Sequence, residues 1–249
     1  MRIKDLLLLA AFLITSGEAM AQTTITSGNV KYVSGNDACL SYYYTNKEAI
    51  GGFQMVVSLP DGVTLEENAQ KTAKGLSING GEAAPATFYN VLVPEGFECI
   101  GVKADVKGQT SDGTAYEAGD VLLVCFPVKA GVAYKGTSTP EQLCKLTLTV
   151  SGGSLEDVAI KGFAGSDTQG TGGSEAAAKY AASADSKTSP TKVLKEGDAN
   201  DDKKINVGDV DFVIERIGEA DFFSNEDADV NGDTKINVGD VDFVIERIV

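Results

Sequence analysis

The chain of 249 residues contains no histidine and no tryptophan. Without histidine, a protein cannot form Ser-His or Cys-His nucleophile pairs or zinc–histidine sites, and it lacks the commonest general base near neutral pH. Without tryptophan, it lacks the largest planar ring on which a sugar can stack. These absences argue against most enzyme classes, and we expect a non-catalytic protein.

Basic residues are also scarce, because 21 lysines and arginines stand against 36 acidic residues and leave a net charge of −15. Nucleic acid is therefore a poor partner, since its phosphates must be neutralised by basic side chains. Divalent cations and basic protein surfaces are better candidates for an acidic chain.

No segment has the roughly 20 consecutive apolar residues that a membrane-spanning helix needs. The N-terminus, MRIKDLLLLAAFLITSGEAMAQ, combines a basic start, a short apolar run over 6–14 and a small-x-small site at 19–21. This pattern predicts a signal peptide over residues 1–21, a mature chain beginning at Gln22, and a secreted, extracellular protein without a membrane span. The alternative is an N-terminal core helix.

Cysteine is rare, with four residues at Cys39, Cys99, Cys125 and Cys144. Export permits disulfides, and four cysteines allow three complete pairings. The spacing is not of the CxxC type, so a metal site on these cysteines is not expected. Disulfide bridges and buried free thiols both remain open.

Residues 22–164 have the pattern of a β domain. CLSYYY, GFQMVVSL, VLLVCFPV and LCKLTLTV are rich in aromatic or β-branched residues, and turn residues such as PDG separate them. The last segment alternates, placing Leu146 and Leu148 on one face of its strand. Short strands of this kind predict a β-sandwich. Residues 165–195, rich in Gly, Ala, Ser and Thr, predict a linker.

Residues 196–249 form a separate acidic unit with 16 acidic and 5 basic residues, a net charge of −11. The phrase INVGDVDFVIERI occurs at 205–217 and again at 236–248. The first five residues of each copy complete a twelve-residue segment, 198–209 in the first and 229–240 in the second. Both segments have oxygen-bearing side chains at positions 1, 3, 5, 9 and 12, which is the spacing of the EF-hand calcium loop. The candidate side-chain ligands are Asp198, Asn200, Asp202, Asn206 and Asp209, and Asp229, Asn231, Asp233, Asn237 and Asp240. At position 7 the backbone carbonyls of Lys204 and Lys235 complete the two sets.

The repeat departs from the usual EF-hand in three respects. Position 12 is Asp instead of the longer Glu. Position 6 is Lys203 or Thr234 instead of Gly, at a turn that favours positive φ and penalises other residues by about 1 kcal/mol. Each loop is followed by one helix, which we expect over 210–217 and 241–248 with Val210, Val213 and Ile217 on one face of the first, and no helix precedes the first loop.

Two loops of the form D-x-N-x-D-x-K-I-N-x-x-D, each followed by one helix, resemble a type I dockerin module over residues 196–249. The resemblance implies a small α module that binds two Ca²⁺ ions and docks onto a cohesin-type partner in a secreted polysaccharide-degrading assembly. The positions that carry partner recognition in the family fall here on Val207, Gly208, Ile214, Glu215, Val238, Gly239, Ile245 and Glu246. Many family members have Ser-Thr and basic residues there, which puts the identity of the partner in doubt. Because the two halves are nearly identical, either half is expected to be able to face the partner, a dual mode known in the family.

The front domain, through SGNDACLSYYYTN, IGGFQMVVSLPDGV and GDVLLVCFPVKA, bears a weaker resemblance to cohesin-like and carbohydrate-binding β-sandwiches. Three functions follow: an adaptor whose sandwich binds glycan or protein, a cohesin-like receptor that links copies of the chain, or a small glycoside-active enzyme. Six tyrosines could act as sugar platforms. Core and edge packing is the preferred interpretation for Tyr42, Tyr43 and Tyr44, whereas both roles remain open for Tyr89, Tyr116 and Tyr134. Carboxylates Glu66, Glu67, Glu95 and Glu98 are the candidates for a glycosidase pair. The predicted fold is therefore mainly β, with a sandwich, a linker and a small helical module.

Overall fold

The computed structural model describes residues 23–69, 71, 76–77, 83–84, 86–110, 113–166, 182–183 and 185–248. The predicted signal peptide over residues 1–21 lies outside this part of the chain, and so do residues 167–181 of the predicted linker.

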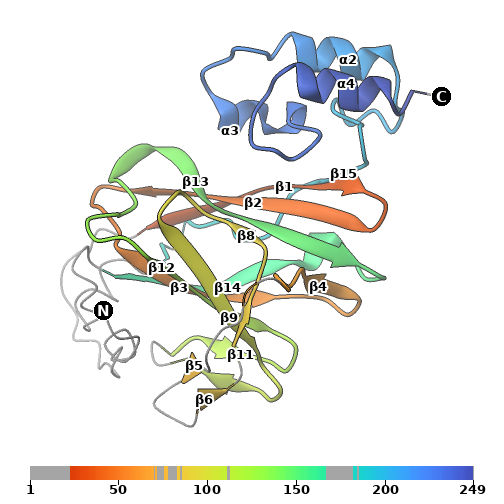
Figure 1. The fold of residues 1–249 in the computed structure, drawn as a ribbon. Helices are drawn as coiled ribbons and strands as arrows, with labels where there is room; N and C mark the ends of the chain where they lie inside the picture. Colours follow the sequence, from red (N-terminus) through yellow and green to blue (C-terminus); the bar gives the residue numbers. More distant parts are fainter. Residues whose placement is uncertain are drawn as a thin grey trace.

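Two sheets form the front domain, as expected for a β-sandwich (Figure 1). The first has the order β15-β1-β2-β13-β4, with β8 also paired to β13; its strands are β1 (Thr24–Ser34), β2 (Asp37–Asn46), β4 (Val63–Leu65), β8 (Val91–Leu92), β13 (Thr137–Val150) and β15 (Val193–Leu194). The second has the order β14-β3-β12-β9-β7; its strands are β3 (Gly52–Ser58), β7 (Thr87–Phe88), β9 (Phe97–Lys103), β12 (Val121–Pro127) and β14 (Ala159–Ser166). Two small hairpins pair β5 (Leu76–Ser77) with β6 (Ala83–Ala84), and β10 (Gly108–Gln109) with β11 (Ala115–Tyr116).

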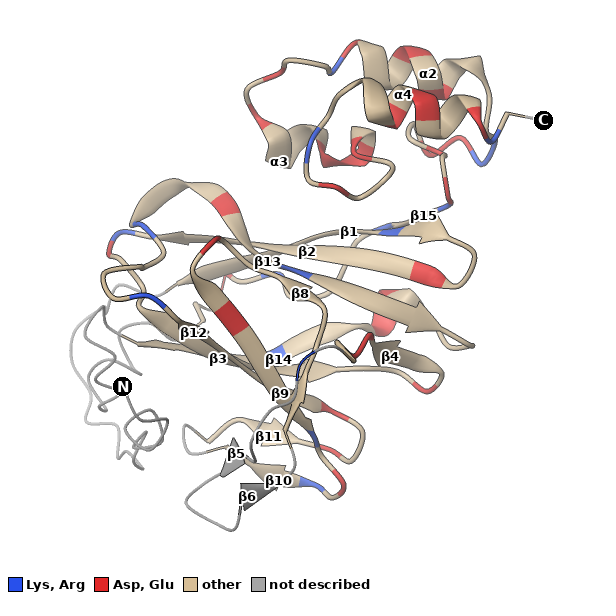
Figure 2. Ribbon diagram, viewed as in Figure 1, with Lys and Arg blue, Asp and Glu red and all other residues tan. Residues whose placement is uncertain are grey.

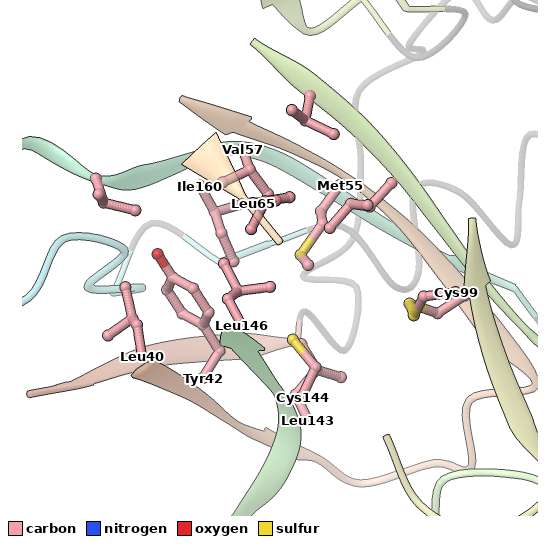
Figure 3. Packing of buried hydrophobic residues seen from close by; sticks show 14 of the residues in the cluster. Leu40, Tyr42, Met55, Val57, Leu65, Cys99, Leu143, Cys144, Leu146 and Ile160 are labelled. Atoms are coloured by element: carbon pink, nitrogen blue, oxygen red, sulfur yellow. A yellow bond between two sulfur atoms is a disulfide. The ribbon is translucent and has the colours of Figure 1, made fainter. Parts of the chain in front are cut away.

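The core lies between the two sheets and follows from alternation along the strands. Tyr42 and Tyr44 of β2 point into it, and Figure 3 shows Tyr42 beside Leu40, with Leu146 next to them on the neighbouring strand β13 of the same sheet. Leu146 and Leu148 are both fully buried, which confirms the face predicted for them. Each large apolar side chain buried in this way contributes about 1.5–3 kcal/mol to folding.

One disulfide joins two neighbouring strands of the second sheet. Cys99 of β9 and Cys125 of β12 are register partners and form the bridge, while Cys39 and Cys144 are buried free thiols. The pairing that the sequence leaves open is therefore one bridge and two thiols. The bridge closes a loop with a sequence separation of 26 residues.

Replacing both bridge cysteines, as in Cys99→Ser/Cys125→Ser, is expected to lower the free energy of unfolding of the sandwich by about 3 kcal/mol. The closed loop restricts the unfolded chain, and its removal restores that freedom. Chemical denaturation monitored by tyrosine fluorescence measures the loss. Reductant is the control, because it should lower the midpoint of the wild-type chain and leave the double variant unchanged; equal midpoints for wild type and variant would contradict the bridge's contribution.

Part of the predicted linker belongs to the first sheet. β15 pairs with β1 in parallel, and isolated bridges join Thr23 to Ala182 and Thr26 to Lys187. Leu194 is only 2% exposed. The linker prediction over 165–195 is thus wrong for the residues that lie alongside β1. Backbone hydrogen bonds to an open strand edge do not depend on side chains, so amino-acid composition does not predict them.

The acidic unit is a small helical module. Its elements are α2 (Val207–Ile214), α3 (Phe222–Asn225), the 3₁₀ helix η3 (Glu226–Ala228) and α4 (Val238–Ile245), and the sandwich contains one further 3₁₀ helix, η2 (Leu155–Asp157). The predicted helices over 210–217 and 241–248 start and end three residues too late. They start earlier because Asn206 and Asn237 cap them by accepting hydrogen bonds from Gly208 N and Gly239 N. Within the described residues, no helix is both long and apolar enough to cross a membrane.

Candidate metal centre and partner surface

The first loop, residues 198–209, curls around its own carboxylates. Asp198 accepts hydrogen bonds from the backbone N–H groups of Asp202 (3.1 Å) and Lys203 (3.0 Å). Asp209 accepts from the N–H groups of Asn200 (3.1 Å) and Asn206 (2.9 Å), so that both ends of the loop turn inward.

The second loop, residues 229–240, repeats this geometry. Asp229 accepts from Thr234 N at 3.1 Å, and Asp240 accepts from Asn231 N at 3.3 Å and from Asn237 N at 2.9 Å. One carboxylate oxygen from each of Asp229, Asp233 and Asp240 lies within 4.8 Å of the others. The sequence spacing thus brings three predicted ligands to one point.

Backbone strain falls where the sequence predicts it. Position 6 of each loop has positive φ, 70° at Lys203 and 71° at Thr234. Position 4, for which no positive φ was predicted, also has it, with 58° at Asp201 and 71° at Gly232. A backbone held in this region by non-glycine residues is a feature of functional loops.

Acidic positions predominate along the ribbon of the helical module (Figure 2), and four of the loop carboxylates are buried. Asp198, Asp209, Asp229 and Asp240 are all at most 2% exposed. Burial raises the pKa of Asp240 to about 6, and burial also raises the pKa of Asp198. A bound cation would stabilise the ionised form of such crowded, desolvated carboxylates.

The donor set fits Ca²⁺. Calcium prefers carboxylate, amide and backbone carbonyl oxygens in loops of this length. Among the described residues, Asp229 Oδ1 is buried and accepts no hydrogen bond, which leaves it free to bind metal. The residues that would hold the ion in each loop are those predicted from the sequence, with the carbonyls of Lys204 and Lys235 still a prediction.

The two helices pack over a very small core. Its buried members are Ala199, Val213, Ala228, Val230 and Val244. Ile205 and Ile236, at position 8 of the loops, pack against it from the two halves. The predicted apolar face is only partly buried, because Val213 is enclosed whereas Ile217 is 40% exposed.

The predicted partner residues lie on the surface of the module. Val207 and Val238 are each 62% exposed, and Ile214 and Ile245 are each 52% exposed. Glu215 and Glu246, which follow the two isoleucines, are exposed as well. Gly208 is half-buried and Gly239 exposed at the helix starts. The same apolar pair is therefore displayed twice, once by each half.

A contact between the module and the sandwich was not predicted from the sequence. Lys31 on β1 is buried against Glu226 and Asp229, and Tyr43 on β2 packs edge-on against Phe223 of α3 with ring centroids 4.6 Å apart. Alternation places Tyr43 opposite Tyr42 and Tyr44, but nothing local indicates that α3 covers it. The module lies over β1 and β2 in Figure 1.

The candidate sugar platforms of the sandwich are mostly enclosed. Tyr42, Tyr43, Tyr44, Tyr89 and Tyr134 are all at most 8% exposed, so their rings cannot stack on a glycan, and only Tyr116 among the six is half-buried. Of the candidate acids, Glu95 and Glu98 form ion pairs with two different lysines, Lys129 and Lys71.

Comparison with known families agrees with the geometry of the loops. Residues 196–249 match the dockerin type I domain. Type I dockerins generally bind calcium, and the carboxylate cages of this dockerin supply suitable ligands. No curated protein matches the chain.

Solved structures similar to the chain are cohesin modules. They include a non-cellulosomal cohesin from Archaeoglobus fulgidus, with 14% identity over 70% of this chain and 87% of that chain at a TM-score of 0.32. The sixth cohesin of scaffoldin B from Acetivibrio cellulolyticus, solved in complex with a dockerin, has 10% identity over 70% and 98% at 0.33. A type I cohesin–dockerin complex from Clostridium thermocellum has 11% identity over 73% and 94% at 0.30.

Proposed function

We propose that this protein is a secreted, non-catalytic adaptor whose dockerin, folded around two Ca²⁺ ions, docks onto a cohesin-type module in a polysaccharide-degrading assembly. The observation that carries the proposal is the repeated unit of a buried carboxylate cage followed by a helix with an exposed apolar pair. Each part of that unit has a task, since the cage shapes the loop and the helix presents the contact surface.

The exposed pairs support a protein partner. Val207 and Ile214, with Val238 and Ile245, expose large apolar side chains on a module that otherwise carries a net charge of −11. Apolar side chains within a charged rim are the usual composition of a protein interface. Basic residues on the partner would complement the glutamates beside the two isoleucines.

Secretion and the absence of catalysis rest on the sequence. The N-terminal pattern of residues 1–21 supports export, and the absence of histidine supports a non-catalytic role. For the sandwich, burial of five candidate tyrosines favours a protein ligand over a glycan. Sedimentation on insoluble polysaccharide tests the glycan alternative, and a polysaccharide activity panel tests the enzyme alternative.

Binding to cohesin modules tests the proposal directly. The full-length chain is titrated by calorimetry against each cohesin encoded in the same genome, in millimolar calcium and again in excess chelator. We expect at least one cohesin to bind in calcium and none in chelator. Failure of every cohesin to bind, or binding that chelator leaves unchanged, would overturn the proposal. Sedimentation velocity of the chain alone separates self-assembly through the sandwich from a foreign cohesin.

A further inference from the structure

The second half of the dockerin is seated on the outer face of the β1–β2–β13 sheet. Lys31 is 3% exposed there, and its Nζ donates hydrogen bonds to the carbonyl oxygens of Glu226 (2.8 Å) and Asp229 (2.9 Å). The same Nζ lies 3.8 Å from Glu226 Oε1 and 3.6 Å from Asp229 Oδ2.

Asp227 and Phe223 widen this contact. Asp227 accepts a hydrogen bond from Asn29 Nδ2 at 2.7 Å and forms an ion pair with Lys192 at 3.4 Å. Phe223 covers Tyr43, whose ring would otherwise be exposed on the outer face of the sheet. An ion pair, hydrogen bonds and an aromatic contact therefore meet around one buried lysine.

The loop itself touches the sheet at Gly232, position 4 of the second loop. A Cβ at Gly232 would lie 3.0 Å from Cys39 Sγ and 3.1 Å from Val33 Cγ1, closer than packed atoms normally approach. The Nζ of Lys145 is 3.9 Å from the same point, so a second lysine faces the loop. A side chain at position 4 would therefore push against Cys39 and Val33, and the loop could keep its place on this sheet only if these side chains shifted.

The first half differs from the second at two of the positions that touch the sandwich. Thirty-one residues earlier, Lys195 stands where the second half has Glu226, and Asp201 stands where it has Gly232. A two-fold rotation of the dockerin would therefore place Lys195 against Lys31 and a side chain against Cys39. The thirteen-residue phrase that the halves share lies outside these positions.

We propose that the β1–β2–β13 face is an internal docking surface that selects the second half of the dockerin, and that metal in the loop over 229–240 maintains the docked state. Asp229 links the two, because its carbonyl accepts from Lys31 while its carboxylate belongs to the metal site. Residues 226–240 carry five carboxylates, so this half stays negative toward Lys31 with a divalent cation bound. The inference goes beyond cohesin binding, because the apolar pairs on α2 and α4 stay exposed in the docked chain.

Matched substitutions in the two loops test this selectivity. Gly232→Asn adds a side chain on the docked side, and Asp201→Asn changes the same position of the free loop. Asparagine tolerates positive φ, and Asp201 already holds 58° there, so both variants should bind calcium. In small-angle X-ray scattering with calcium, we expect Gly232→Asn to raise the radius of gyration from the ~18 Å of a compact chain of this length to roughly 20 Å or more, with Asp201→Asn unchanged.

Lys31→Glu tests the same contact from the sandwich side without altering either loop. It places like charges together and should expand the chain as Gly232→Asn does, whereas Lys129→Glu on an exposed edge should not. Chelator should expand the wild-type chain at least as much, because it both releases the dockerin and unfolds it. The proposal is overturned if the calcium-loaded wild type is already extended, or if both Gly232→Asn and Lys31→Glu remain compact. A wild type that is compact with and without calcium refutes the link to metal alone, whatever the outcome for cohesin binding.

Discussion

Excess chelator is expected to unfold residues 196–249 while leaving the sandwich folded. The dockerin core has five buried apolar residues, and all of them are the small side chains of alanine or valine. Modules of about 50 residues with so little apolar burial are marginally stable without a metal. The metal-free loops also hold four carboxylates at 2% exposure or less, whose charges repel one another. Binding at 1,000 times the dissociation constant contributes about 4 kcal/mol per site, enough to reverse this balance.

Circular dichroism during a chelator titration measures the loss of helix from α2 and α4. Asp240→Ala should weaken calcium binding at the second loop by at least about tenfold, because the position-12 carboxylate closes the cage. Asp242→Ala is the matched control, since Asp242 is exposed on the same helix and is not a predicted ligand. Helix content that is unaffected by chelator would show that the loops fold without metal.

Substituting one exposed isoleucine should weaken cohesin binding only about twofold, whereas substituting both should weaken it at least 100-fold. Ile214 and Ile245 are equally exposed at corresponding positions of the two halves. If either half can face the partner, Ile214→Asp removes one of two equivalent orientations. Ile214→Asp/Ile245→Asp removes both, and an apolar anchor in the centre of an interface is worth roughly 2–4 kcal/mol.

Calorimetry with a cognate cohesin measures these affinities. Val106→Asp is the control, because Val106 is a 69% exposed apolar residue of the sandwich, away from the helices. Circular dichroism confirms that the variants remain folded, as expected for exposed positions. A hundredfold loss from one single variant and none from the other would mean that only one orientation is used.

Local patterns in the sequence predict much of this molecule. Alternation along β13 places Leu146 and Leu148 on the core face, and the ligand spacing brings carboxylate oxygens of Asp229, Asp233 and Asp240 together in the second loop. These features depend on neighbours within about twelve residues. The helix starts are wrong by one turn because Asn206 and Asn237 serve both as loop positions and as helix caps.

Long-range pairings escape such patterns. The bridge between Cys99 and Cys125 depends on which strands become neighbours, and the parallel pairing of β15 with β1 depends on an open edge about 160 residues earlier. The burial of Lys31 likewise depends on contact between the surface of the sandwich and that of the dockerin. No property of the residues around Lys31 distinguishes it from an ordinary exposed lysine of a strand.

The pairing of β15 with β1 also determines the length of the tether between the sheet and the dockerin. Only Lys195 separates the end of β15 from residue 196, so a released dockerin remains within a few residues' reach of the sheet. Such a short tether gives an effective local concentration in the millimolar range or above. Re-docking is therefore independent of protein concentration. A foreign ligand for the same sheet must compete with the dockerin, which remains covalently attached beside it.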